Sequence, residues 1–133
     1  MKRAARSLGF AVSGLVHAFR HERNLMLFSL GHIIVCLTLL ARLQVSALVY
    51  IFILSIFGGF FIVVELLNTA IERLADTFDD CEKKHRGGHY HPGIKMTKDV
   101  AAAASLIALS IYGFAFLIMC YGMYLARAFS SLN

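Results

Sequence analysis

Five polar side chains recur between positions 65 and 76 with the spacing of a single helix face. They follow a run of 20 uncharged residues and stand at i, i+3, i+4, i+7 and i+11, as Glu65, Asn68, Thr69, Glu72 and Asp76. We call them the polar stripe. A carboxylate near hydrocarbon is costly unless it is paired, hydrated or bound to a metal, so Glu65 is a functional candidate. A merely solvated helix end would explain Asp76, but it explains Glu65 poorly.

Two further segments add to the chemistry of the polar stripe. Glu22 is the only acidic residue among the first 64, and Lys98-Asp99 directly precedes the last apolar run. Phosphoryl transfer needs acids that hold a divalent cation beside bases that hold phosphates, because its transition state spreads negative charge over oxygens. A carboxylate at the membrane boundary can also accept the proton of a lipid hydroxyl. The sequence contains no Walker A loop, dinucleotide-binding glycine pattern or HExxH motif.

Three long apolar runs must hold these residues in place. Hydrophobic residues make up 59% of the 133 positions, and Leu25–Ala41, Val45–Val64 and Val100–Ala126 contain no Asp, Glu, Lys or Arg. As helices of 17, 20 and 27 residues, these runs can cross the roughly 30 Å of membrane hydrocarbon. We therefore predict an all-α integral membrane protein, a single domain over 1–133. Its three spans are expected at about 25–43, 45–67 and 100–126.

Residues 3–20 predict an amphipathic helix ahead of the first span. Leu8, Val12, Leu15 and Phe19 recur at i, i+4, i+7 and i+11, and the basic residues lie away from that row. A helix of this kind lies in the membrane interface with its apolar face in the acyl boundary. It serves either as an anchor alone or also as a contact for an anionic ligand, and both interpretations stay open.

The basic residues predict the orientation in the membrane. Eleven of the 13 lie before the first span or between the second and third, and only Arg42 and Arg127 lie on the other side. The positive-inside rule then puts the N-terminus and a central loop at about 77–99 in the cytoplasm, with the C-terminus outside. This distribution accounts for the net charge of +5, so we expect no nucleic acid as a partner.

The polar and small residues inside the spans are expected to serve helix packing. His32 reads as a hydrogen-bonded interior residue rather than a metal ligand. Gly58-Gly59 and the small residues 101–105 allow another helix to approach closely. Cys81 stands among histidines in the central loop, but with one cysteine and no standard finger spacing we do not predict a zinc site there.

The motif E-x-L-N-T-A-I-E-x-x-x-D over Glu65–Asp76 resembles that of the prokaryotic diacylglycerol kinase family, which includes the undecaprenol kinases. The resemblance continues in Gly14 followed by Glu22, and in Tyr90-His91 followed by Lys98-Asp99, so it covers nearly the whole chain. It implies a small three-span homotrimeric enzyme with an N-terminal surface helix. Such an enzyme transfers the γ-phosphoryl group of ATP to a membrane lipid alcohol and uses Mg²⁺.

The same resemblance implies a role for each matching residue. Glu65 would be the general base on the lipid hydroxyl, and Glu22 and Glu72 would bind the metal. The implied nucleotide-binding residues are Glu22, Glu72, Lys98, Asp99, Arg3, Arg6, Tyr90 and His91, and the implied substrate-binding residues are Glu65, Asn68 and Lys98. The role of Asp76 is not assigned. The chain departs from familiar members in a longer, more charged segment between Asp76 and Tyr90.

The acceptor lipid is predicted from short segments. Glu22-Arg23-Asn24 and His91-Pro92 resemble the undecaprenol kinase branch more than the diacylglycerol branch, so undecaprenol is favoured and diacylglycerol is the alternative. The resemblance also implies the bacterial cytoplasmic (inner) membrane. A rival of another class is a small oligomeric proton or cation transporter that uses Glu65. It explains Glu65, but it leaves the acids and bases on the cytoplasmic side without a purpose.

Overall fold

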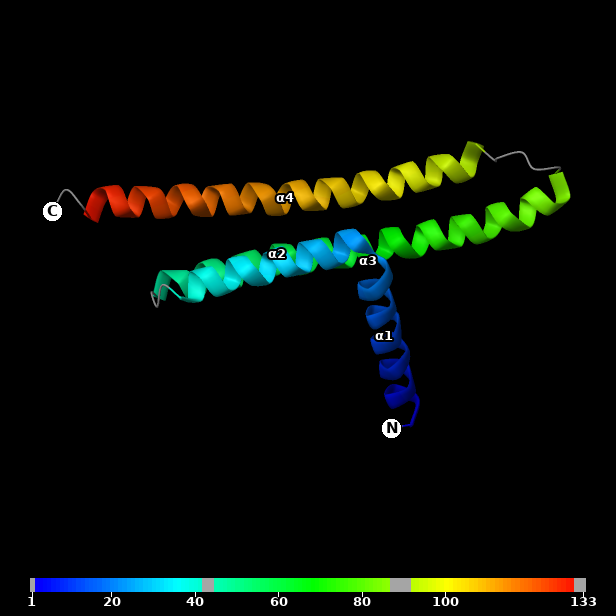
Figure 1. Cartoon of the computed structure of the whole chain (residues 1–133), viewed down its shortest axis with the longest axis horizontal. Helices are drawn as coiled ribbons and strands as arrows, with labels where there is room; N and C mark the ends of the chain where they lie inside the picture. The colour runs from blue at the N-terminus through cyan, green and yellow to red at the C-terminus, as the bar shows by residue number, and fades with distance from the viewer. Residues whose placement is uncertain (1, 42–44, 87–91, 131–133) are drawn as a thin grey trace.

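Four helices make up the computed structural model of the chain, which describes residues 2–41, 45–86 and 92–130 (Figure 1). They are α1 (Lys2–His21), α2 (Arg23–Leu40), α3 (Val45–Arg86) and α4 (Pro92–Ser130). Helices α2, α3 and α4 each contain a segment long and apolar enough to cross a membrane. The predicted all-α architecture, with three membrane-spanning helices after an N-terminal helix, is confirmed.

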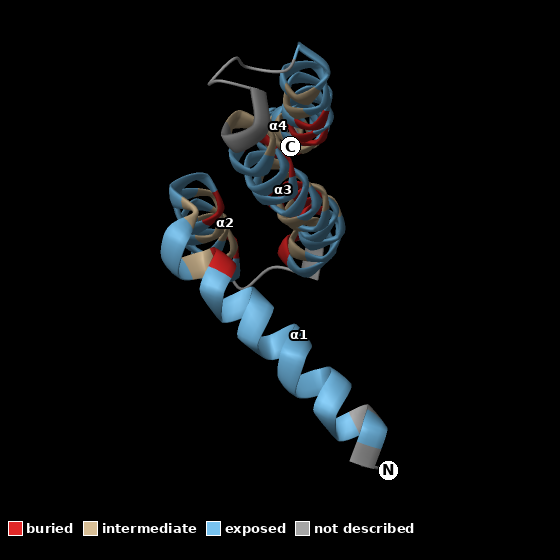
Figure 2. Ribbon diagram, turned by 90° about the vertical axis from the view of Figure 1, so that its right-hand side faces the viewer, coloured by how far each residue is buried: buried red, intermediate tan, exposed pale blue. Residues whose placement is uncertain are grey.

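Helices α2, α3 and α4 lie side by side, and α1 runs crosswise to them from one end of α2 (Figures 1 and 2). The most extensive packing joins α3 and α4. Large apolar side chains on the outer faces, such as Leu30 and Leu117, are exposed, as the hydrocarbon core of a bilayer requires. When the bundle crosses the bilayer, the crosswise α1 lies along the membrane surface.

The membrane-spanning part of the bundle has a small apolar core, and a polar contact joins α2 to α4 beside it. Leu39, Ala47, Leu54 and Met119 form the buried cluster. His32 Nδ1 lies 2.9 Å from the Tyr112 hydroxyl, which confirms His32 as a hydrogen-bonded interior residue.

The two adjacent glycines of the second span, Gly58 and Gly59, have different surroundings. A Cβ atom at Gly58 would stand 3.2 Å from the His32 ring, so Gly58 allows α2 and α3 to approach closely there. A Cβ atom at Gly59 would meet nothing within 4 Å among the described residues of the chain, so Gly59 lies on an open face of α3 and close approach of a helix there stays a prediction.

The central loop predicted at 77–99 is mostly helical, and this part of the prediction is wrong. Helix α3 continues to Arg86 and α4 begins at Pro92, so only residues 87–91 separate them. Residues 77–86 contain no glycine or proline, and an ion pair between Lys83 and Asp79 links successive turns. Proline is well tolerated at the first position of a helix, as at Pro92. Helices α3 and α4 therefore extend together past the end of α2 (Figure 1).

Glu22 forms the corner between α1 and α2. Its backbone is extended, with φ −101° and ψ 102°, whereas His21 and Arg23 on either side are helical. The Glu22 amide donates to the Ala18 carbonyl at 2.8 Å, and its carbonyl accepts from the Met26 amide at 3.1 Å. The backbone of Glu22 thus forms a hydrogen bond with each of the two helices. These two bonds fix the position of the corner and of the Glu22 side chain.

Candidate functional site

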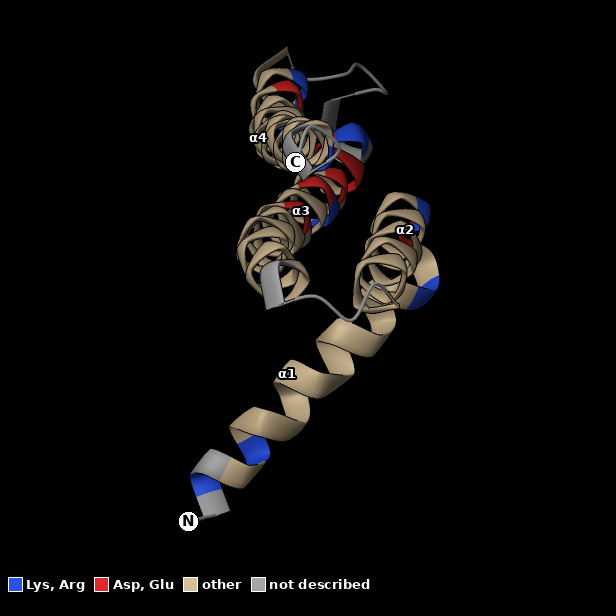
Figure 3. Cartoon of the chain, turned by 90° about the vertical axis from the view of Figure 1, so that its left-hand side faces the viewer, with Lys and Arg blue, Asp and Glu red and all other residues tan. Residues whose placement is uncertain are grey.

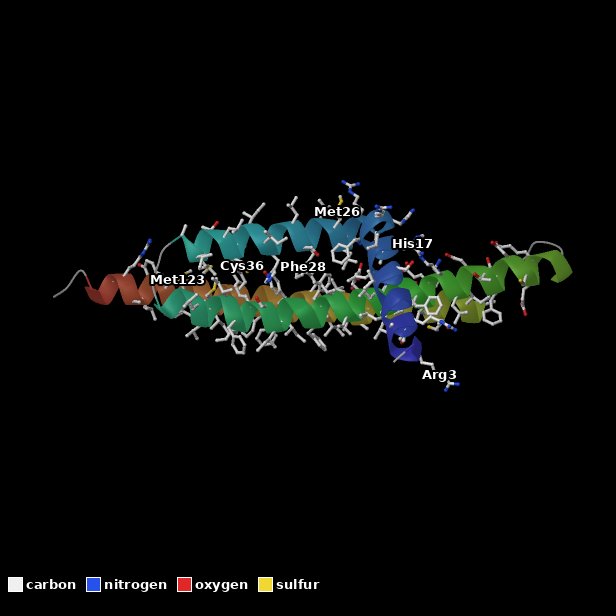
Figure 4. The ribbon with its side chains drawn as sticks, turned by 90° about the horizontal axis from the view of Figure 1, so that it is seen from below. Arg3, His17, Met26, Phe28, Cys36 and Met123 are labelled. Atoms are coloured by element: carbon white, nitrogen blue, oxygen red, sulfur yellow. The ribbon has the colours of Figure 1, made fainter. Side chains whose placement is uncertain are left out.

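A cavity of about 610 Å³ opens between α2, α3 and α4 beside the polar stripe. Figure 4 shows Phe28 extending from α2 toward α3, whereas Met26 points away from the bundle. The wall is apolar on one side and polar on the other. The lining residues are Asn24, Leu27, Phe28, Phe61, Glu65, Asn68, Glu72, Ala102, Ser105, Leu106 and Leu109. An elongated molecule with an apolar tail and a polar end matches this lining.

Glu65 is buried at the apolar part of the cavity. Its side chain is on α3, and Glu65 Oε2 accepts a hydrogen bond from Ser105 Oγ on α4. Both residues are only 7% exposed. Only one of the two carboxylate oxygens is engaged by Ser105, so the other oxygen can accept a further hydrogen bond. This is the arrangement that a proton acceptor for a lipid hydroxyl needs.

Asn68 and Glu72 form the polar part of the cavity, one and two turns further along α3. Asn68 Nδ2 donates a hydrogen bond of 3.1 Å to Glu72 Oε1. Asn68 Oδ1 is buried and has no hydrogen-bond partner among residues 2–41, 45–86 and 92–130. The pair therefore offers a carboxylate oxygen and an amide oxygen whose bonding capacity is not filled by the residues described.

The polar stripe does not act as one face, because its members divide among three environments. Thr69 is buried against α1 in a second cavity of about 350 Å³, together with His17 and Arg73. Successive residues are about 100° apart around a helix, so Asn68 and Thr69 face different neighbours. Asp76 lies beyond both cavities and accepts a hydrogen bond of 2.8 Å from Lys98 Nζ. Only Glu65, Asn68 and Glu72 share the main cavity.

The implied metal ligands Glu22 and Glu72 have different partners. Arg73 Nη2 donates to Glu22 Oε1 at 2.9 Å, which ties the α1–α2 corner to α3 next to Glu72. Glu72 lines the main cavity, and Glu22 is not among the lining residues. Spacing along the chain does not predict the contact of Glu22 with Arg73, because the two residues are 51 positions apart.

The implied nucleotide contacts are only partly brought together. Lys98 reaches the polar stripe, where it forms an ion pair with Asp76. Asp99, the next residue of α4, is exposed. Arg3 lies at the far end of α1, away from the bundle, and Arg6 is exposed one turn further on (Figure 4). The single chain therefore does not bring these two arginines to the cavity. Tyr90 and His91 lie outside the described residues.

Charge is strongly concentrated near the polar stripe. Figure 3 shows several acidic positions of the ribbon, in red, on α3, with basic positions, in blue, close by. Within this extension Asp79 is only 3% exposed and pairs with Lys83. Helix α3 therefore has an apolar segment and a charged extension. The main cavity lies where the two meet.

The oxygen donors of the cavity suit Mg²⁺. This ion prefers carboxylate and carbonyl oxygens, and it usually keeps several waters and takes phosphate oxygens beside one or two carboxylates. Glu72 and the unpartnered Asn68 Oδ1 provide such donors. In the described part of the chain, no group of three or more His, Cys, Asp or Glu forms a complete metal site. A metal held here would therefore take its remaining ligands from water and from a phosphate-bearing substrate.

The fold and the cavity define a multi-pass membrane protein with an acidic site at the boundary between lipid and water. A model of the family described as prokaryotic diacylglycerol kinase matches residues 9–120, so the chain belongs to this family. It is thus a lipid kinase, of a kind that generally uses ATP with a divalent metal. The matched range includes the corner at Glu22, the polar stripe and Lys98, and it leaves out Arg3 and Arg6. Comparison with curated proteins gave no match.

Two residues of the site were missed at the level of sequence. Ser105 was counted only among small residues that allow close packing, and Arg73 was counted only as a cytoplasmic charge. Each forms its important contact with a residue on another helix, 40 and 51 positions away. Spacing along one helix carries no information on such contacts.

Proposed function

We propose that this lipid kinase transfers the γ-phosphoryl group of ATP to the hydroxyl of a membrane lipid alcohol, with Mg²⁺ as the metal. The observation that carries the proposal is the division of one cavity into an apolar part with buried Glu65 and a polar part with Asn68 and Glu72. Seven residues of α-helix separate Glu65 from Glu72, a rise of about 10 Å. The lipid enters from the membrane side, and the nucleotide enters from the cytoplasmic side.

Glu65 acts as the general base in this proposal. It accepts the proton of the lipid hydroxyl as the hydroxyl oxygen bonds to the γ-phosphorus and the bond from that phosphorus to ADP breaks. Glu65 is buried, and the apolar side chains of Phe61, Leu106 and Leu109 line the cavity with it, which keeps bulk water away from the reacting oxygen. Asn68 lies one turn further on α3 and positions the phosphoryl group relative to the lipid hydroxyl.

Glu72 binds Mg²⁺ together with Glu22, and the nucleotide lies at this polar end. The metal supplies neutralisation of the charge that develops on phosphoryl oxygens. Lys98 and Asp99 contact the nucleotide, and Lys98 also approaches the lipid headgroup. For Arg3, Arg6, Tyr90 and His91, a nucleotide contact rests on the family resemblance alone.

Undecaprenol is the acceptor that we favour, and diacylglycerol is the alternative. The preference rests on Glu22-Arg23-Asn24 and on His91-Pro92. We further infer a homotrimer in the bacterial inner membrane, with the N-terminus and the 87–91 connection in the cytoplasm. The distribution of basic residues supports this orientation, and the family resemblance supports the trimer.

The test is a comparison of Glu65→Gln and Glu72→Gln in the purified protein. Transfer of labelled phosphate from ATP is measured with undecaprenol and with diacylglycerol, and ATP binding is measured separately at varied Mg²⁺. Glu65→Gln should lower turnover by roughly 10²–10⁴-fold, because it removes only the proton acceptor. It should still bind ATP with metal. Glu72→Gln should lose nucleotide affinity as well as turnover.

Asp80→Asn is the matched control, since it removes one exposed carboxylate from the same helix outside the cavity. It should keep normal turnover. Near-normal turnover of Glu65→Gln at saturating lipid would remove Glu65 as the base. Proton flux that depends on Glu65, in a parent protein without lipid phosphorylation, would favour the transporter instead.

A further inference from the structure

The hydrogen bond between Ser105 and Glu65 joins the two buried polar residues in the apolar part of the main cavity. Ser105 is on α4 and Glu65 is on α3, and each is 7% exposed. Among the described residues that line this cavity, Ser105 carries the only hydroxyl group. The hydrogen bond therefore involves the carboxylate of Glu65, which is the general base in the proposed function.

Close packing alone does not account for a serine at this position. Ala101, Ser105 and Ala108 are the buried small residues at spacings of four and three on α4, where it packs against α3. Alanine meets the steric requirement at the two neighbouring positions, and it would do so at the third. What serine adds is a hydroxyl, and that hydroxyl donates to Glu65.

The bond restricts the orientation of the Glu65 carboxylate. Ser105 Oγ holds Oε2, and Oε1 has no hydrogen-bond partner within the residues that the structure describes. A hydrogen bond to a charged group in a place of low polarity is stronger than one in water, so it limits rotation of the carboxylate. Proton transfer needs the acceptor oxygen within hydrogen-bond distance of the lipid hydroxyl, and a fixed orientation favours that geometry.

We propose that Ser105 is a positioning residue, which holds Oε2 of Glu65 so that Oε1 faces the hydroxyl of the acceptor lipid. The proposal rests on the proposed function of Glu65 as the general base. Ser105 touches neither the nucleotide nor the metal in this scheme. Its loss should therefore affect turnover and leave ATP binding unchanged.

The experiment compares Ser105→Ala and Ser105→Thr with Ser110→Ala in mixed micelles. Ser110 is on the same helix, where its hydroxyl donates to the Leu106 carbonyl, so its removal controls for the loss of a hydroxyl. Ser105→Ala should lower kcat by roughly tenfold or more and leave the KM for ATP unchanged. Ser105→Thr keeps the hydroxyl and should restore most of the activity, and Ser110→Ala should have normal kcat.

A double variant separates this proposal from that for Glu65. In a Glu65→Gln background the further change Ser105→Ala should have no additional effect, because the group that it positions is gone. An equal loss in both backgrounds would overturn the proposal, as would a Ser105→Ala protein with normal kcat or a threonine variant no better than alanine. Normal turnover of Glu65→Gln itself would instead overturn the proposed function. Size-exclusion elution of each variant verifies its assembly.

Discussion

At the scale of single residues, the acids near the membrane boundary differ in the charge of their partners. Glu65 and Glu72, which line the main cavity, accept hydrogen bonds from the neutral side chains of Ser105 and Asn68. Glu22 and Asp76, which lie outside it, are instead paired with the cations Arg73 and Lys98. A carboxylate outside an ion pair does not have to release a cation before it binds a metal ion. The pattern therefore makes Glu72 a readier ligand than Glu22.

In the proposed scheme, Arg73 competes with the metal for Glu22. Replacing Arg73 by Met keeps the apolar stem and removes the charge, so we expect half-maximal activity at lower Mg²⁺. The change should be at most about fivefold, because an ion pair this exposed contributes little. The measurement is a Mg²⁺ titration of lipid phosphorylation at saturating ATP.

Lys95→Met serves as the control, since it removes an exposed cation from α4. It should leave the Mg²⁺ requirement unchanged. A higher Mg²⁺ requirement in Arg73→Met would contradict competition, and it would indicate instead that Arg73 contacts the phosphates of the nucleotide.

At the scale of elements, the sequence predicts the spans well and their extensions poorly. Uncharged runs define the spans, because burial in hydrocarbon excludes charge along the whole length of a helix. The end of a helix in water depends instead on weaker local preferences, and the ion pair of Asp79 with Lys83 favours a longer α3. The polar stripe was expected on one face, yet Thr69 turns toward α1. The site residues on α3 were predictable, but their partners on other helices were not.

Helix α1 carries a titratable pair where it meets the bundle. The rings of His17 and His21 stack with centroids 4.2 Å apart. The charge of His21, with smaller effects of lost hydration and of Arg73, holds the pKa of His17 below its ordinary value of 6.5, and Glu22 opposes the shift. Because the folded pKa is the lower one, the packing of α1 is fully retained above pH 6.5. It should weaken as the pH falls from there through the folded pKa.

Replacing His21 by Ala should raise the pKa of His17 toward its ordinary value, because the largest cause of the shift is removed. An NMR titration of the His17 ring in micelles measures both values. Arg20→Gln is the matched control, since Arg20 is close in the sequence and does not contribute to the shift. A His17 that titrates at or above 6.5 in the parent protein would contradict this account.

At the scale of the whole molecule, the crosswise α1 meets the bundle where the charged extension of α3 and α4 passes the end of α2 (Figure 1). The native cysteines can report on which side of the membrane this end lies. Cys81 is exposed on the extension, whereas Cys36 and Cys120 are half-buried in the membrane-spanning segments. A membrane-impermeant maleimide should therefore label Cys81 in inverted membrane vesicles and not in intact cells.

A variant with Cys81→Ser and Arg127→Cys provides the opposite control, because Arg127 is exposed near the other end of α4. It should label from outside the cell and not from the cytoplasmic side. Labelling of Cys81 in intact cells would reverse the orientation, and it would separate the site from cytoplasmic ATP.

The continuity of α3 has a consequence for the choice of lipid. Its 42 residues form one unbroken helix of about 63 Å, so Glu65 and Glu72 cannot change their spacing along it. The phosphoryl group is therefore transferred at a constant depth below the membrane surface. A lipid is selected partly by how far its hydroxyl rises from the hydrocarbon, and a thicker or thinner bilayer alters that height without altering the enzyme. The same acceptor should be phosphorylated at different rates in membranes of different thickness.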